Sequence, residues 1–466
     1  MPCVSNKSLL RQVSSGLFMW YDKIKDTDPQ IYEYIKSELA RQQDGLEMIP
    51  SENFTSIAVM QASGSILTNK YSEGYPGRRY YGGNEFIDKI ETLSSERAKK
   101  LFKVPYANVQ PYSGSPANLA VYFAICKPGD TIMGLDLTNG GHLTHGWKTS
   151  VTGQTFNSIP YHVKKDGMVD LEEVRKLAKD SKPKMIWVGY TAYPREFPFE
   201  EFSSIAEDTG AYLVADISHI AGLVAGGAHK SPVDYAHIVT TTTHKTLRGP
   251  RGAIIMVTEK GMKKDPDLGK KIDKTIIPGM QGGPHNHQTA AIAVALLEAS
   301  QPSFKGYADQ VVKNAKVLAS SLMNNGITTV TNGTDTHLIL IDLTPFGNGL
   351  GIFAEEALGA AGITVNKNTI PGEPSSPFYP SGIRLGTPAL TTRGMKEAEM
   401  QEIGMLFAEV LNQIKDEKLP ENKEEIQRHM ERFRAEIKEN PKIKEVHAKV
   451  LEISRRFPLY DEIELK

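Results

Sequence analysis

Residues 185–216 alternate apolar strands with a helix, and this alternation constrains the fold more than any other feature of the sequence. Residues 185–190 (MIWVGY) and 211–216 (AYLVAD) are predicted as strands, and residues 199–209 between them as a helix. Strands that are apolar almost throughout are typical of a parallel sheet covered by helices on both faces. The sequence therefore predicts an α/β protein. The second strand ends at Asp216, at the sheet edge where proteins of this class bind ligands.

A single lysine stands out in the next β-branched stretch. Residues 239–243 are predicted as a buried strand, residues 252–257 as another, and Lys245 as part of the tight loop between them, near Arg248 and Arg251. Burial and nearby cations lower the pKa of a lysine and make its amine a nucleophile. We interpret Lys245 as a residue that forms a Schiff base with a carbonyl cofactor, for which pyridoxal phosphate is the obvious candidate. A surface hairpin with a solvated lysine is the alternative that this stretch leaves open.

The chain is long enough for one large and one small domain, with 466 residues. We predict an N-terminal arm and helix over residues 1–45 and a large α/β domain over residues 46–302. A smaller α+β domain with a charged helical tail is predicted over residues 303–466.

Charge and cysteine content indicate which partners and which compartment to expect. The net charge of -1 gives no reason to expect nucleic acid or an anionic membrane as a partner. No apolar run approaches the length of a membrane span. Cys3 and Cys126 lie far apart and form no disulfide framework, which fits a reducing compartment, so a cytoplasmic protein is expected.

Several short segments carry groups suited to a phosphorylated, flat cofactor. Ser115 and Pro116 fit the N-cap and first position of a helix, so residues 113–115 form a candidate phosphate cradle, although a well-capped helix that binds nothing has the same sequence. Glycines beside His142 let its imidazole approach a flat ligand. No carboxylate or cysteine stands nearby to complete a metal site, so none is expected there. Asp216 would pair with a protonated pyridine nitrogen.

Two further segments suggest substrate binding. Residues 71–83 form a loop rich in tyrosine and glycine that serves a site or an interface, or else packs on itself as a surface loop. Arg384 lies on an apolar segment between glycines, where it grips a substrate carboxylate or forms an internal ion pair.

Taken together, these motifs make the chain similar to serine hydroxymethyltransferases from about Asp28 to its end. The likeness is carried by residues 50–53 (PSEN), 69–77 (NKYSEGYPG), 140–146 (GGHLTHG), 216–223 (DISHIAGL) and 240–252. It implies a fold-type I pyridoxal phosphate transferase with a mostly parallel seven-stranded sheet. It also implies a homodimer or homotetramer with active sites shared across the interface. The implied reaction interconverts serine and tetrahydrofolate with glycine and 5,10-methylenetetrahydrofolate.

The resemblance also implies roles at matching positions. Lys245 would hold the cofactor, Asp216 would pair with its ring nitrogen, and His142 would stack on its ring. The other implied cofactor contacts are Ser113, Gly114, Ser115, Thr191, His219, Thr242, His244 and, from the partner subunit, Gly283. Arg384 would clamp the amino-acid carboxylate, supported by Ser51, Tyr81 and Arg251. Glu73 and Tyr71 would reach in from the other subunit, with Glu73 handling protons. The implied folate pocket comprises Leu137, Gly141, His142, Leu143, Asn368, Ser376, Pro377 and Phe378.

Two other readings remain open at this point. A folate-independent aldolase of the same fold class, which cleaves 3-hydroxy amino acids such as threonine, would explain Lys245, Asp216 and Arg384. It would not explain the loop at residues 375–378 or the one around Glu73. A non-catalytic scaffold or RNA-binding descendant is the third reading, but the sequence retains all the expected chemical residues and its net charge is near neutral.

Overall fold

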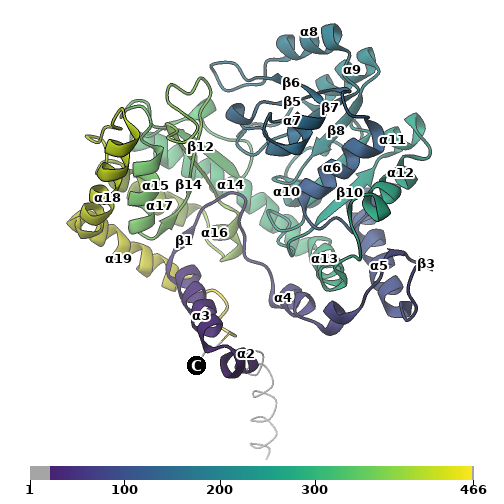
Figure 1. The fold of residues 1–466 in the computed structure, drawn as a ribbon. Helices are drawn as coiled ribbons and strands as arrows, with labels where there is room; N and C mark the ends of the chain where they lie inside the picture. The colour runs from purple at the N-terminus through teal and green to yellow at the C-terminus, as the bar shows by residue number, and fades with distance from the viewer. Residues whose placement is uncertain (1–20, 464–466) are drawn as a thin grey trace, which may run out of the picture.

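The structure is a computed structural model that describes residues 21–463, and its larger body is built on a seven-stranded sheet (Figure 1). The strands lie in the order β4-β10-β9-β8-β7-β5-β6. Strands β5 to β9 pair in parallel, and only β10 runs antiparallel to its neighbours β9 and β4. The mostly parallel sheet that the sequence predicts is therefore confirmed. The strands are β4 (Tyr106–Asn108), β5 (Thr131–Leu135), β6 (Asn157–Tyr161), β7 (Met185–Gly189), β8 (Tyr212–Asp216), β9 (Ile238–Thr242) and β10 (Ala253–Val257).

Helices cover both faces of this sheet. In β7, Ile186 and Val188 join one core, whereas Met185 and Trp187 join the core on the opposite face. Burial on both faces explains why the strands are apolar almost throughout. The first core is covered by α5 (Glu85–Phe102), α8 (Leu171–Ser181), α9 (Phe199–Thr209), α10 (Ala221–Gly226) and α13 (Asn286–Ala299), and the second by α6 (Gly114–Ile125) and α12 (Leu268–Lys274).

The smaller body, green to yellow in Figure 1, contains an antiparallel four-stranded sheet in the order β11-β12-β15-β14. Its strands are β11 (Thr328–Thr329), β12 (Leu338–Asp342), β14 (Asn366–Asn368) and β15 (Gly382–Gly386). The helices are α14 (Pro302–Asn324), α15 (Gly351–Ala360), α16 (Pro388–Thr392), α17 (Glu397–Leu411), α18 (Lys423–Glu439) and α19 (Pro441–Arg456). Pro441 separates the last two helices, and Ile426, Met430, Phe433 and Ile437 of α18 are buried, as their helical spacing predicts.

Apart from the 16-residue helix α3, the remaining described segments are short. They are α2 (Asp22–Thr27), α3 (Pro29–Asp44), α4 (Ile57–Ser63), α7 (Val151–Thr155), α11 (Glu259–Lys264), β1 (Leu46–Glu47), β2 (Gly74–Tyr75), β3 (Arg78–Arg79), β13 (Ile363–Thr364), η1 (Ile66–Asn69), η2 (Leu137–Asn139), η3 (Leu143–His145), η4 (Thr275–Met280) and η5 (Val330–Asn332). No helix within residues 21–463 combines the length and apolar character needed to cross a membrane.

The chain crosses between the two bodies near both predicted domain boundaries. Strand β1 pairs in parallel with β13, and Leu46 and Met48 are buried in the C-terminal core. In the other direction, Phe304 and Tyr307 at the start of α14 pack into a core of the large sheet. The division into residues 1–45, 46–302 and 303–466 stays a prediction. Any such division has to allow for segments that pack into the core of the neighbouring body.

Two helix boundaries differ from the prediction. The sequence favours one helix from Gln61 to Lys70, but α4 ends at Ser63 and a separate 3₁₀ turn, η1, follows Gly64 and Ser65. Helix α6 begins two residues earlier than predicted, with Ser113 at the N-cap instead of Ser115. Pro116 is tolerated within the first turn because the N–H groups of that turn have no partner within the helix.

Arg393 connects the N-terminal helix to the C-terminal one. Its buried guanidinium donates hydrogen bonds to the carbonyl oxygens of Gln43 (2.9 Å) and Gly45 (2.9 Å) at the end of α3, and of Ser454 (2.7 Å) and Phe457 (2.9 Å) at the end of α19. Burial lowers the pKa of Arg393, with the charge of Asp44 acting in the opposite direction. One charged fork therefore satisfies the carbonyl groups of two helix ends.

Replacing Arg393 by methionine should lower the free energy of unfolding by about 3 kcal/mol, because buried carbonyl groups lose a charged donor. Urea or thermal unfolding of the full chain measures this effect. The matched control is Arg434→Met, which removes only an ion pair with Glu356 from a guanidinium side chain that is 48% exposed. The control should change stability by less than about 1 kcal/mol. Equal stability of the two variants would contradict the role assigned to Arg393.

Candidate active site

A cavity of about 440 Å³ opens at the carboxyl ends of β8 and β9. Many of the residues predicted for the site line it together, although they come from segments far apart in the sequence. The predicted residues among its lining are Ser51, Ser113, Gly114, Ser115, His142, Thr191, Asp216, His219, Thr242, His244, Lys245 and Arg251. Glu52, Tyr190 and Ser218 complete the lining.

Lys245 lies on the turn between β9 and β10, with its amine directed into this cavity. Its Nζ donates a hydrogen bond to Oγ1 of Thr242 at 3.0 Å, and Nδ2 of Asn53 donates to its backbone carbonyl at 3.0 Å. Burial lowers the pKa of Lys245 to about 8, although the charge of Asp216 acts to raise it. Arg251 also lines the cavity, whereas Arg248 lies over the ring of Tyr307 at 4.2 Å from its centroid. The amine therefore loses its proton at a lower pH than an ordinary lysine does.

Asp216 ends β8 and is fixed by three side chains. Its Oδ2 accepts from Asn118 at 2.9 Å and lies 3.2 Å from Nε2 of His145, and its Oδ1 accepts from the Ser218 hydroxyl at 2.5 Å. Burial alone would raise the pKa of this carboxyl. Hydrogen bonds and charge from its neighbours, foremost His145, nevertheless hold it well below its ordinary value. The carboxylate remains ionised and oriented toward the cavity.

The cavity's other histidines stay neutral. Burial lowers the pKa of His142 to about 4 and that of His244 to about 3, and neighbouring cations add to both effects. Burial also holds the pKa of His219 well below its ordinary value, and its Nδ1 lies 3.3 Å from Nε2 of the fully buried His337. These imidazoles therefore provide flat, uncharged surfaces and hydrogen-bonding groups near neutral pH.

The N-terminus of α6 forms another side of the cavity. Ser113, Gly114 and Ser115 line it, and no side chain caps the helix. A Cβ atom at Gly114 would lie 2.8 Å from Cγ2 of Thr242, so only glycine lets this turn pack against β9. Uncapped N–H groups and the positive end of the helix dipole suit a phosphate.

Arg384 projects from β15 toward the larger body. Its Nε donates to Oδ1 of Asn366 at 3.0 Å, and its NH1 donates to the carbonyl oxygen of Thr191 at 2.6 Å. Burial lowers the pKa of Arg384 to about 10, and the charge of Glu52 partly opposes this. No ion pair to Arg384 is found within residues 21–463, so the internal ion pair considered from the sequence is absent there. A buried guanidinium with only neutral hydrogen-bond partners is suited to an anionic ligand.

The remaining predicted substrate residues lie outside the cavity of their own chain. The Tyr71 hydroxyl donates to Glu73 at 3.2 Å, and the rings of Tyr71 and Tyr81 meet edge to face with centroids 5.1 Å apart. Gly283 is close to the same group, because a Cβ at this glycine would lie 3.3 Å from the Tyr71 ring. Tyr71 and Tyr81 are about half exposed. These four residues form a second cluster, which we call the Glu73 cluster.

The predicted folate residues come from two segments of the chain, residues 137–143 and residues 368–378. Thr369 Oγ1 donates to the carbonyl oxygen of Thr138 at 2.9 Å, which joins the segment after β14 to η2. Within the folate set, Leu143 is 49% exposed and Phe378 is 81% exposed. The predicted set is Leu137, Gly141, His142, Leu143, Asn368, Ser376, Pro377 and Phe378, and of these only His142 lines the cavity around Lys245.

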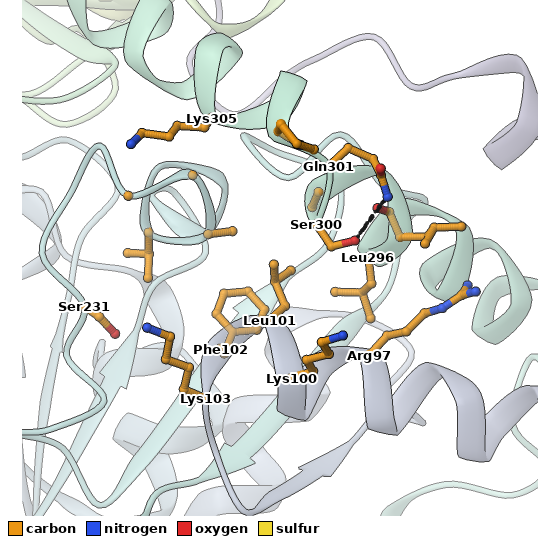
Figure 2. A pocket seen from close by; sticks show the side chains of 17 residues that line it. Arg97, Lys100, Leu101, Phe102, Lys103, Ser231, Leu296, Ser300, Gln301 and Lys305 are labelled. Atoms are coloured by element: carbon orange, nitrogen blue, oxygen red, sulfur yellow. Dashed lines mark hydrogen bonds between the residues drawn. The ribbon is translucent and has the colours of Figure 1, made fainter.

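A larger cavity, of about 680 Å³, lies elsewhere and contains none of the predicted residues (Figure 2). Arg97, Lys100, Lys103 and Lys305 contribute cationic side chains to it, and Leu101 and Phe102 contribute apolar surface. Size alone therefore does not locate the chemistry. The smaller cavity is the candidate active site because it brings together a lysine of lowered pKa and a buried carboxylate.

The sequence did not predict the residues that hold other side chains of the site in position. Asn118 and His145 hold Asp216, Ser218 also accepts from the backbone N–H of Thr242 at 3.0 Å, and His337 stands behind His219. His145 and Ser218 had a visible signal, because they lie in residues 140–146 and 216–223, which carry the family likeness. Within residues 21–463 no group of three or more metal-binding side chains is arranged to hold an ion.

Comparison with known proteins supports the same assignment. The family model for serine hydroxymethyltransferase matches residues 24–407. A protein of Acidothermus cellulolyticus named serine hydroxymethyltransferase is 57% identical over 389 residues, which cover 83% of this chain and 89% of the relative. A protein of the same name from Prochlorococcus marinus is 54% identical over 389 residues, which cover 83% of this chain and 90% of the relative.

These matches favour hydroxymethyl transfer over the folate-independent aldolase and over the non-catalytic scaffold, and they bear out the fold-type I architecture. The chain belongs to the serine hydroxymethyltransferase family, and the prediction that it is an enzyme of this kind is confirmed.

Proposed function

We propose that the cavity around Lys245 binds pyridoxal 5'-phosphate and that the hydroxymethyl carbon of serine is transferred there to tetrahydrofolate. The observation that carries this proposal is the buried amine of Lys245 facing the same cavity as the ionised carboxylate of Asp216. When bound, pyridoxal phosphate supplies an electron sink for the charge released when a bond to the amino-acid Cα breaks.

The lining residues fit this cofactor group by group. Lys245 would hold the aldehyde carbon, and Asp216 would accept a hydrogen bond from the ring nitrogen and keep it protonated. The backbone and hydroxyl groups of Ser113, Gly114 and Ser115 would bind the phosphate. The remaining proposed cofactor contacts are His142 against the ring, Thr191 and His219 near the ring hydroxyl, Thr242 and His244 beside the lysine, and Gly283 of the partner subunit.

Arg384 would bind the carboxylate of the amino acid. Its guanidinium is held by Asn366 and by the backbone of Thr191, which leaves it oriented before substrate arrives. Arg384 is not part of the described lining of the cavity around Lys245, whereas Ser51 and Arg251 line it and would support the substrate, together with Tyr81. His244, whose Nε2 lies 3.2 Å from the Arg251 guanidinium, would influence which amino acids react.

Glu73 would hold or release the proton at the serine hydroxymethyl oxygen. In the single chain it lies with Tyr71 outside the cavity, which supports an assembly in which the Glu73 cluster of one subunit completes the site of another. We therefore propose a homodimer or homotetramer, and a folate pocket formed by the set named above. We also propose the three-part division at residues 45 and 302. The buried Cys126 is a free thiol, which supports a cytoplasmic location.

Replacing Lys245 by alanine should abolish multiple turnover, because within residues 21–463 it is the one lysine that lines the cavity and could hold the cofactor and release product. The visible absorbance of the lysine-bound cofactor should disappear when the variant passes through a gel-filtration column without prior chemical reduction. The fold should be retained. The control is Lys270→Ala, whose side chain is 81% exposed and which should behave like the unchanged enzyme. Sustained turnover by the Lys245 variant would overturn the assignment.

Replacing Arg384 by alanine should weaken serine binding by about 2–5 kcal/mol, because a buried charged pair with the substrate carboxylate is lost. The serine affinity of Arg384→Lys should lie between that of the unchanged enzyme and that of the alanine variant. An ammonium keeps the charge but cannot form two parallel hydrogen bonds. Titration of the cofactor spectrum with serine measures both affinities. An unchanged affinity in the alanine variant would exclude the clamp.

Capture of pyridoxal phosphate by the cofactor-free enzyme should accelerate with pH and level off above about pH 8. Only the unprotonated amine of Lys245 is a nucleophile, and its pKa is lowered to about 8 from an ordinary 10.5. Stopped-flow absorbance across pH 6–10.5 measures this profile, with a control for the titration of the free cofactor. A rate still rising steeply at pH 10 would show that the lysine is unperturbed.

A further inference from the structure

We propose that Arg79 is a positioning residue for Glu73. The proposal rests on the function proposed above for Glu73 and concerns how that carboxylate is held in place. Arg79 lies on β3, which pairs with β2 as a two-residue hairpin, and Gly74 stands directly opposite it. Glu73 comes immediately before β2, so the arginine and the carboxylate belong to the two arms of one hairpin.

The guanidinium of Arg79 binds the peptide groups on both sides of Glu73. Its NH1 donates to the carbonyl oxygen of Ser72 at 2.9 Å and to that of Gly74 at 2.8 Å. The carbonyl oxygen of Glu73 itself accepts from the backbone N–H of Tyr80 at 3.0 Å. Three successive carbonyl groups around the glutamate are therefore fixed by the opposite arm of the hairpin.

The other nitrogens of Arg79 attach the hairpin to helix α5. Nε donates to Asp88 at 2.8 Å, and NH2 donates to the buried Glu91 at 2.6 Å. Only 4% of the Arg79 side chain is exposed. Gln110 ties the same groups together, because its Nε2 donates to both the Gly74 carbonyl and Glu91. Helix α5 therefore fixes the position of Glu73 through the buried guanidinium of Arg79.

The Glu73 side chain has little support of its own. Within the described chain its carboxylate accepts one hydrogen bond, from Tyr71, which is itself about half exposed. A proton-transfer group must lie within hydrogen-bonding reach of its target, and small displacements cost rate strongly. Because the side chain is weakly held, the backbone that carries it has to be fixed, and Arg79 fixes it.

A double-mutant cycle on the complete cofactor-bound enzyme tests this role. The variants are Glu73→Gln, Arg79→Lys and the pair combined. Arg79→Lys keeps a positive charge for Asp88 and Glu91, but one ammonium cannot also bind both carbonyl groups. The matched control is Arg78→Lys on the same strand, whose side chain is 66% exposed and contacts Asp273 instead.

Arg79→Lys should lower kcat of the tetrahydrofolate-dependent reaction by about tenfold or more while leaving the KM for serine within about twofold. In the Glu73→Gln background the same change should have almost no further effect, because a positioning residue acts only through the group it positions. Arg78→Lys should resemble the parent enzyme. Thermal unfolding and the cofactor absorbance confirm that each variant is folded and loaded.

The outcomes separate the two proposals. Full kcat in Glu73→Gln would overturn the role of Glu73 and, with it, that of Arg79. An impaired Glu73→Gln with a normal Arg79→Lys, or losses that multiply in the double variant, would overturn the Arg79 proposal alone. If Arg79→Lys does not fold, Asp88→Asn loosens the guanidinium without removing it. That variant should lower kcat a few-fold only when Glu73 is present, and an unchanged kcat would overturn the proposal.

Discussion

The ionised carboxylate at the end of β8 is the interaction on which the site depends. A buried charge is costly unless it is paired and hydrogen-bonded. Asn118 and His145 meet one oxygen of Asp216, and Ser218 meets the other. Each comes from a different segment, so the sheet, α6 and the loop after β5 must all be in place before the charge is stabilised. The charge in the cavity is therefore stabilised only when these parts of the fold are assembled.

The lining of the cavity places two cationic side chains, Lys245 and Arg251, against two carboxylates, Asp216 and Glu52. Lys245 and Arg251 line the same cavity, and the charge of Arg384 reaches Lys245, whereas burial keeps His142 and His244 neutral. Arg384 adds one further positive charge near Lys245, which the carboxylate of a ligand would balance. The histidines contribute surface without adding further positive charge, which explains why so many basic residue types can share one small space.

Elements with a local sequence signal can be predicted from the sequence. Contacts between segments that lie far apart along the chain cannot. The strands ending at Gly189 and Asp216 were clear because both of their faces are buried. The sequence predicts the start of α6 two residues too late, because Ser115 and Pro116 have the residue types of a helix start, whereas Ser113 is the N-cap. Lys245 and Asp216 carried chemical signals of their own. The roles of Asn118 and Arg79 could not be inferred, because their partners lie far along the chain or are backbone atoms.

The strand pairing of residues 46–47 with residues 363–364 has a practical consequence for dissecting the molecule. The C-terminal core is completed by Leu46 and Met48. Along the sequence, the segments that form the larger body lie between these two residues and the rest of that core. A fragment cut at residue 303 would expose the apolar surface that these two side chains cover. An isolated C-terminal piece would therefore have to carry a grafted copy of the short N-terminal strand to remain well packed.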